Sequence, residues 1–208
     1  MAPAISTRGE ALQSFEHLED DLRYLPERWL PRTAELRDFA ARWLEAWNTH
    51  NLDALETMVT EDITWEDPAQ FGETVHGRAE FRAFAADLFS GIPDVRFDLI
   101  GAPHLPLEGD GLAVRWRMTG TFTGDLPLWG KRFGQNPPAY APTGRSIDIE
   151  GVDLYEYRDG LISRWVIVYD LFGLSQQLGL LPPADSRMLP VIVRAQRLVA
   201  RLRRRRGA

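Results

Sequence analysis

Residues 147–169 read IDIEGVDLYEYRDGLISRWVIVY, and this stretch decides the fold. Isoleucines at 147 and 149 alternate with acids at 148 and 150, which is the two-residue period of a half-buried strand. Strand-like runs follow at 152–157 and 161–169. Asp159-Gly160 between these runs is a dipeptide favoured in two-residue hairpin turns. The stretch therefore predicts antiparallel strands joined by a tight turn.

The period of the apolar residues changes on moving outward from this hairpin. Short strands are predicted at 63–65, 95–99 and 112–118. Helical spacing is seen in two earlier stripes, formed by Leu36, Phe39, Ala40, Trp43, Leu44 and Trp47 and by Phe81, Phe84, Ala85, Leu88 and Phe89. Helices followed by antiparallel strands predict the α+β class. Helices would then cover one face of a curved sheet, and the other face would enclose a cavity or meet a partner subunit.

Composition and charge narrow the possible functions. The chain has 208 residues and no cysteine, which excludes disulfides, thiolate nucleophiles and cysteine metal sites. No secretory signal and no apolar run long enough to cross a bilayer are visible, so a cytoplasmic location is expected. The chain has a formal net charge of −6. Its tail from Ala184 onward contains eight Arg and one Asp and so carries a charge of +7, which leaves −13 on residues 1–183. Nucleic acid is therefore not expected as a partner of the acidic body.

The same patterns divide the chain into three parts. Residues 1–33 are predicted to be an N-terminal extension, 34–183 a single α+β domain, and 184–208 a basic amphipathic C-terminal helix. A Gly- and Pro-rich insertion at 124–141 has the length of a lid or binding loop. The basic helix is expected either to contact an anionic membrane or to dock on the acidic body.

Several short motifs occur in order between Leu36 and Pro183. They are FAARWLEAWNTHNLDAL at 39–55, WEDP at 65–68, HGR at 76–78, PTGR at 142–145, DGLI at 159–162 and QQLG at 176–179. Together they resemble the SnoaL-like polyketide cyclases of the nuclear-transport-factor-2-like superfamily. The resemblance implies a cone-shaped α+β barrel of the cystatin-like kind, with a curved antiparallel sheet backed by N-terminal helices. It also implies a homodimer and a deep hydrophobic pocket.

Catalysis in the family that the chain resembles is a cofactor-free intramolecular aldol closure, in which an aspartate is the acid and base. The match places that role on Asp170, whose neighbours in sequence are strongly apolar. A carboxyl held in an apolar cavity could both remove and return a proton, because desolvation raises its pKa. The alternative is that Asp170 caps the N-terminus of the following helix.

Other candidate residues surround this prediction. Arg117 is a second catalytic candidate, since it could pair with Asp170 or polarise a carbonyl, or it could belong to a solvated charge ladder with acids of a neighbouring strand. The candidates for a substrate-binding wall are Trp65, Trp116, Trp129, Tyr140, Trp165 and His76, although aromatic residues can equally be core and His76 a surface residue. The four histidines lack metal-ligand spacing, so no metal is expected, and the resemblance implies a reaction without a cofactor.

The resemblance, together with these candidate residues, implies a cofactor-independent polyketide cyclase, or a related lyase or isomerase, acting on a bulky apolar or polycyclic carbonyl compound. A non-catalytic binding protein with the same cavity is the first alternative. An epoxide hydrolase is another, and it would need paired acids and an Arg that converge on a water molecule.

Overall fold

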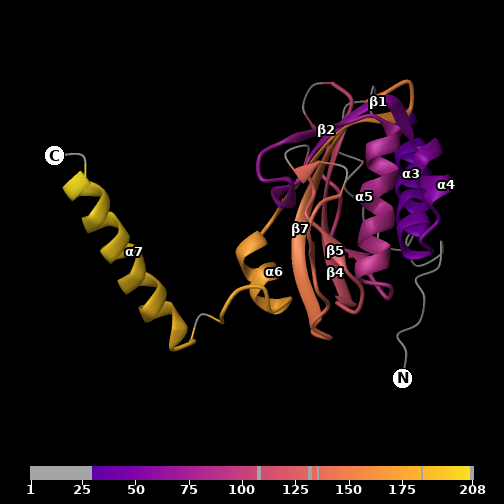
Figure 1. Ribbon diagram of the computed structural model, residues 1–208. Helices are drawn as coiled ribbons and strands as arrows, with labels where there is room; N and C mark the ends of the chain where they lie inside the picture. Colours follow the sequence, from indigo (N-terminus) through magenta and orange to yellow (C-terminus); the bar gives the residue numbers. More distant parts are fainter. Residues whose placement is uncertain (1–29, 107–108, 131–132, 135, 184, 207–208) are drawn as a thin grey trace.

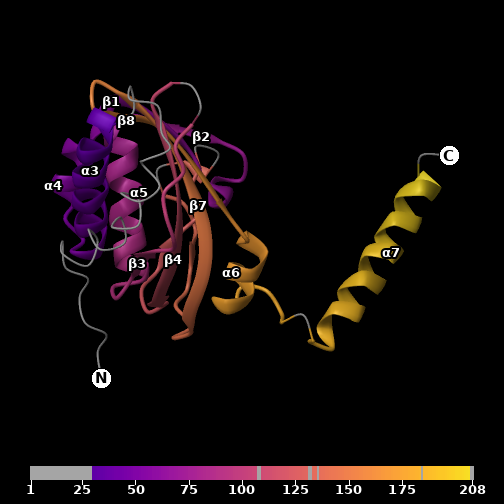
Figure 2. The ribbon, with the colours of Figure 1, turned by 180° about the vertical axis from the view of Figure 1, so that it is seen from behind.

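The structure, a computed structural model, describes residues 30–106, 109–130, 133–134, 136–183 and 185–206. The predicted N-terminal extension therefore lies outside the described residues as far as residue 29, and residues 30–33 already belong to helix α3 (Leu30–Asn48). A short helix α4 (Leu52–Thr57) and helix α5 (Arg78–Gly91) complete the helical layer. These three helices lie together on one face of the sheet (Figures 1 and 2).

The main sheet has six strands in the order β2-β1-β8-β7-β4-β3. Their bounds are β1 (Val59–Glu66), β2 (Thr74–His76), β3 (Arg96–Leu99), β4 (Gly111–Thr121), β7 (Ser146–Arg158) and β8 (Leu161–Tyr169). A 3-10 turn, η3 (Pro68–Gln70), links β1 to β2. The sheet is curved but not closed, so the predicted α+β class is confirmed, with an open sheet in place of a full barrel.

One pairing departs from the antiparallel arrangement that the sequence predicts. β1 and β8 run parallel, and Trp65 lies opposite Trp165 in this pair. Parallel neighbours need a crossover between them, and α5 supplies one by running across the sheet between β2 and β3. This pairing brings the first and the last strand of the sheet side by side.

The predicted hairpin is present between β7 and β8. Asp159 and Gly160 have φ angles of 54° and 77°, and positive values at both central positions are those of a type I′ turn. β7 is one continuous strand of 13 residues. It passes Gly151, where a side chain would overlap the ring of Trp116, since an added Cβ would lie 2.2 Å from Trp116 Cζ2. Glycine therefore lets that indole lie across β7.

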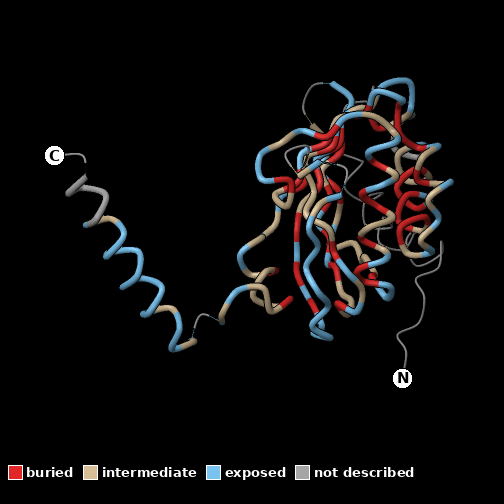
Figure 3. Tube along the Cα trace, in the orientation of Figure 1, coloured by how far each residue is buried: buried red, intermediate tan, exposed pale blue. Residues whose placement is uncertain are grey.

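The core lies between the sheet and the helices, as the buried segments in Figure 3 show. Aromatic rings dominate its centre: the Trp43 ring centroid lies 6.0 Å from Phe81 and 5.8 Å from Trp165. The opposite face of the sheet carries charged pairs and several exposed apolar side chains.

Two further parts of the chain complete the domain. The insertion forms a small two-stranded sheet of β5 (Leu126–Pro127) and β6 (Ala139–Tyr140). After β8 come helix α6 (Leu171–Gln177) and, beyond a linker, helix α7 (Met188–Arg206). In Figure 1, α7 stands away from the body.

Candidate functional site

A cavity of about 180 Å³ lies between the inner face of the sheet and the helical layer. Its walls come from α3 and α5, from β4, β7 and β8, and from residues of β5, β6 and α6. Nearly all of the lining side chains are apolar or aromatic. Two carboxylates, Asp67 and Asp153, are the acids that line it among the described residues. The predicted hydrophobic pocket is therefore present, and its acids are not the predicted ones.

Asp153 lies in the middle of β7 and points inward with Ile149 and Tyr155, because alternate residues of a strand share a face. Its neighbours directly across the sheet are Val114 on β4 and Ile167 on β8. The side chain is 7% exposed. A carboxyl with two apolar strand neighbours is thereby held away from water.

The hydrogen bonds of Asp153 leave one of its oxygens without a partner. The Tyr155 hydroxyl donates to Oδ2 at 2.6 Å, and the Trp43 indole N–H donates to the Tyr155 oxygen at 2.9 Å. Asp153 Oδ1 and the indole N–H groups of Trp116 and Trp165 are buried, and none of them meets hydrogen-bond geometry with a partner in the described part of the chain. The two indole N–H groups nevertheless lie close enough to the carboxyl to lower its pKa. An unsatisfied buried carboxylate oxygen is costly, and such sites are a common mark of function.

Asp67 provides the second carboxyl of the cavity. It caps η3, where Oδ1 accepts a hydrogen bond from the Ala69 N–H at 2.7 Å. The same oxygen accepts a hydrogen bond from the Tyr169 hydroxyl at 2.7 Å. Asp67 and Tyr169 are far apart in sequence, and the parallel pairing of β1 with β8 brings them together.

Burial sets the protonation of both acids. Desolvation raises the pKa of Asp153 to about 6, and the polar contacts from Tyr155, Trp165 and Trp116 offset part of that rise. Desolvation likewise raises the pKa of Asp67 to about 6, against the hydrogen bonds from Ala69 and Tyr169. The charge of Asp67 adds to the rise at Asp153. Both groups therefore exchange protons close to neutral pH, where a general acid or base works best.

Asp170, the residue that the sequence favours for catalysis, lies outside this cavity. Its side chain is exposed, and Oδ1 accepts a hydrogen bond from the Gly173 N–H at 2.9 Å as the N-cap of α6. A helix begins with backbone N–H groups that have no partner within the helix, and this carboxylate satisfies one of them. The structure therefore agrees with the capping alternative for Asp170. The prediction that Asp170 faces the cavity as the catalytic acid is corrected.

Arg117, the second catalytic candidate, lies on the outer face of the sheet. Its Nε donates to Asp148 at 2.6 Å, and Arg115 forms the equivalent pair with Glu150 at 3.0 Å. These side chains are about half exposed. Arg117 therefore belongs to a solvated charge ladder with acids of the neighbouring strand, which was the alternative considered from the sequence. It does not reach the cavity.

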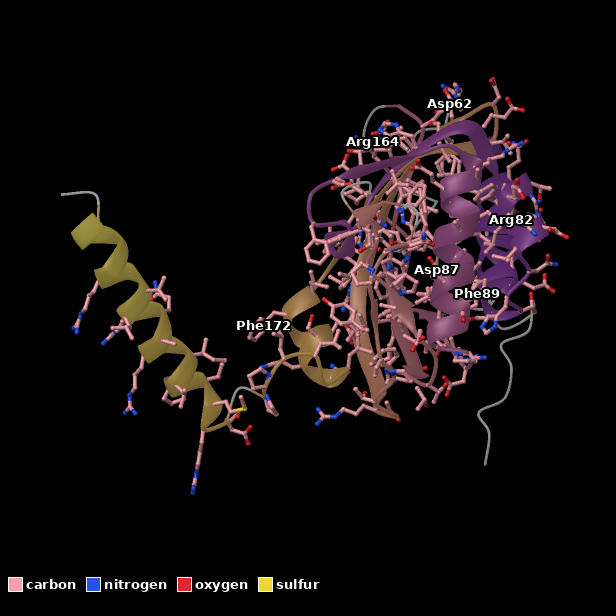
Figure 4. The ribbon with its side chains drawn as sticks, in the orientation of Figure 1. Asp62, Arg82, Asp87, Phe89, Arg164 and Phe172 are labelled. Atoms are coloured by element: carbon pink, nitrogen blue, oxygen red, sulfur yellow. The ribbon has the colours of Figure 1, made fainter. Side chains whose placement is uncertain are left out.

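Four of the six aromatic or histidine candidates for the substrate-binding wall border the cavity. Trp116, Trp129, Tyr140 and Trp165 line the cavity, whereas Trp65 is fully buried in the core and His76 is exposed on β2. Trp129 packs against Phe84 with ring centroids 4.7 Å apart, and its indole N–H donates a hydrogen bond to the Asp87 carboxylate on α5 at 3.1 Å. Figure 4 labels Asp87 on that helix. The insertion thus contributes a wall that is anchored to α5.

Within the ranges given above, no group of three or more His, Asp or Glu side chains is placed to hold a metal ion. Among the same residues, none of the helices is both long and apolar enough to cross a bilayer.

Solved structures share this architecture at low sequence identity. AclR from Streptomyces galilaeus, named as a proposed hydroxylase, is 19% identical with a TM-score of 0.56, and the alignment covers 84% of this chain and 98% of that one. A proposed SnoaL-like polyketide cyclase from a Jannaschia species is 21% identical with a TM-score of 0.56 over 73% and 96%. A protein from Catenulispora acidiphila with a ketosteroid isomerase-like fold, in complex with trimethylamine, is 23% identical with a TM-score of 0.53 over 72% and 96%.

At these identities the structures establish the fold alone, and their named activities differ. The comparison with curated proteins finds no match. The model of the SnoaL-like domain matches residues 40–165, which include both cavity acids. This chain belongs to the SnoaL-like domain family.

Proposed function

We propose that the protein is a cofactor-independent acid/base enzyme that moves a proton at the carbon next to a carbonyl group, with Asp153 as the acid and base. The observation that carries this proposal is the buried Asp153 carboxyl, which has one unpartnered oxygen and borders an apolar cavity. The polyketide cyclase and ketosteroid isomerase-like names among the structural neighbours fit the same class of chemistry.

The proposed reaction conserves protons. Ionised Asp153 removes a proton from the substrate carbon, and the C–H electron pair forms an enolate. The protonated carboxyl then returns that proton, either to another carbon in an isomerisation or to the new alkoxide after the enolate has attacked a second carbonyl. Tyr155 holds Oδ2 throughout, and Trp43 fixes the Tyr155 hydroxyl. Oδ1 is left for the substrate proton.

The size of the cavity limits the substrate. A protein cavity of about 150 Å³ is known to take up benzene, so about 180 Å³ suits a compound of one or two rings. Larger polycyclic compounds would need β5, β6 or α6 to move, because these elements supply part of the wall. We therefore propose a compact apolar ketone or keto ester as substrate, smaller than the polycyclic compounds considered from the sequence.

Hydrogen–deuterium exchange tests the proton transfer before the natural substrate is known. Cyclohexanone and 3-cyclohexenone would be incubated with the protein in D₂O, and deuterium entry beside the carbonyl would be followed by NMR. We expect catalysed exchange that falls at least 100-fold in Asp153→Asn, since general acid/base catalysis contributes about 10²–10⁴-fold.

Asp170→Asn is the matched control, because it makes the same chemical change at the exposed cap and should retain full exchange. Equal exchange in the wild type and Asp153→Asn would refute the role of Asp153. If both proteins bind these ketones with the same affinity and neither catalyses exchange, the cavity is a binding site and the enzymatic proposal fails.

A further inference from the structure

Helix α7 is a long helix whose described side chains, as far as Arg201, are mostly exposed. Figures 1 and 2 show it standing clear of the body from opposite directions, and in Figure 3 most of its described length is coloured as exposed. Large apolar side chains are about half exposed along it, namely Met188, Val191, Ile192, Val193, Leu198 and Val199. These six are half of the large exposed hydrophobic residues in the described chain, so the helix is the main uncovered apolar surface.

The exposed residues divide between two sides of the helix. At 3.6 residues per turn, Val191, Ile192, Leu198 and Val199 fall on one side together with Ala195, while Arg194, Arg197 and Arg201 fall on the other. From Met188 to the last residue the sequence contains seven Arg and neither Asp nor Glu. α7 therefore combines an apolar face with an opposite face whose charged residues are all Arg, and Val193 lies beside Arg197 on that second face.

Four acids on the outer face of the sheet already have cationic partners. Its acids Asp148 and Glu150 are paired with Arg117 and Arg115. Arg164 similarly bridges two acids, Glu66 and Glu156. A cationic helix that docked there would have to break these pairs, so a surface with free negative charge and an apolar interior is the better complement.

We propose that α7 is an anchor that lies in the plane of an anionic lipid surface. The apolar side would enter the boundary between headgroups and acyl chains, and the Arg side would face the phosphates and carboxylates of the lipids. A nucleic acid would match the charge but would leave the valine, isoleucine and leucine side chains in water. The two faces together favour the lipid surface.

The linker before α7 keeps the acidic body apart from the helix. It is fastened to α6, since Leu180 N–H donates to the Ser175 carbonyl at 2.8 Å and Gln176 Nε2 donates to the Pro182 carbonyl at 2.8 Å. The Pro182-Pro183 pair then restricts the backbone. Exposed Phe172 projects from α6 on the side of the molecule where α7 lies (Figure 4). Separation of this kind lets α7 bind a charged surface that would repel the body.

Vesicle binding by the full chain tests the proposal. The protein would be floated with phosphatidylcholine vesicles and with vesicles containing about 30% phosphatidylserine, at low and high salt. We expect binding to the anionic vesicles only, and weaker binding at high salt because salt screens the attraction. Replacing Arg194, Arg197 and Arg201 by Gln should lower the affinity about 100-fold, at roughly five-fold for each Arg.

A matched variant controls for the loss of charge. Arg42, Arg115 and Arg158 are about half exposed on the body, and changing these three to Gln removes the same charge and should leave vesicle binding intact. Ile192→Ser with Leu198→Ser should also weaken binding, through the apolar side. The membrane-anchor proposal would be refuted by an absence of vesicle binding or by equal binding to neutral vesicles. It would also be refuted by tighter binding to duplex DNA, or by a change in oligomer mass caused by the α7 variants.

Discussion

Replacing Asp153 by Asn should make the protein more stable at neutral pH while it removes the proposed activity. Asp153 has a pKa of about 6 in the folded protein, against 3.8 for an ordinary aspartate. The folded state therefore holds its proton more tightly than the unfolded state does. By linkage, this residue lowers the free energy of unfolding as pH rises from about 4 to about 6, and the loss then levels off.

The size of the effect follows from the shift in pKa. About two pKa units at 1.36 kcal/mol each amount to about 3 kcal/mol above pH 7, of which roughly 2 kcal/mol develops between pH 4 and pH 8. Asn has nearly the same shape and carries no charge. Its amide adds a buried N–H₂ group near the indole N–H groups of Trp116 and Trp165, and this costs about 1 kcal/mol or more at every pH.

Urea unfolding of the wild type and Asp153→Asn across pH 4 to 8 separates these two contributions. The amide cost is independent of pH, so the change with pH in the difference between the proteins reports the buried charge alone. We expect the variant to gain about 2 kcal/mol relative to the wild type on going from pH 4 to pH 8. If the difference in free energy of unfolding between the two proteins stays constant over this range, the pKa of Asp153 is not raised. Asp153 would then not be protonated near neutral pH, as the proposed acid/base role requires.

The remaining predictions concern the neighbours of this residue and the helix cap. Gly151→Ala should lower the free energy of unfolding by about 1–3 kcal/mol through overlap with Trp116, and Trp116→Phe should restore part of it in a double-mutant cycle measured by urea unfolding. Tyr155→Phe should move the acidic limb of the exchange rate to higher pH, because the Tyr155 hydrogen bond lowers the pKa of Asp153 and its removal raises that pKa; an unmoved limb would contradict this. Asp170→Ala should cost about 1 kcal/mol of stability at unchanged exchange, with Asp170→Asn near neutral in both measurements.

Much of the fold was predictable because its signals are local. The alternation along β7 and the Asp159-Gly160 turn each lie within a few residues, and both are present as predicted. The parallel pairing of β1 with β8 has no such signal, since it depends on how α5 crosses the sheet. Sequence spacing therefore could not bring Asp67 next to Tyr169, which is 102 positions later.

The position of the main acid was within reach of the sequence. Asp153 has the same parity as Ile147, Ile149 and Tyr155, which places it on the inner face of its strand. An acid at an inward position is a stronger signal than apolar neighbours in sequence. Asp170 has such neighbours, but at the junction of β8 and α6 the unpaired N–H groups of the helix determine what its side chain does.

Helix α6 connects the cavity with the linker that leads to α7. Leu171 and Leu174 of this helix and Leu178 at its C-terminal end line the cavity, and the linker that leads to α7 leaves from the same end. If α7 lies on a lipid surface, the wall formed by α6 is the part of the cavity joined most directly to that surface. An apolar substrate partitions into lipid, so this arrangement would shorten its path to Asp153. Vesicles containing cyclohexanone should then speed hydrogen–deuterium exchange in the wild type more than in the α7 variant that lacks three Arg. Equal exchange rates in the two proteins would show that membrane binding by α7 does not assist catalysis.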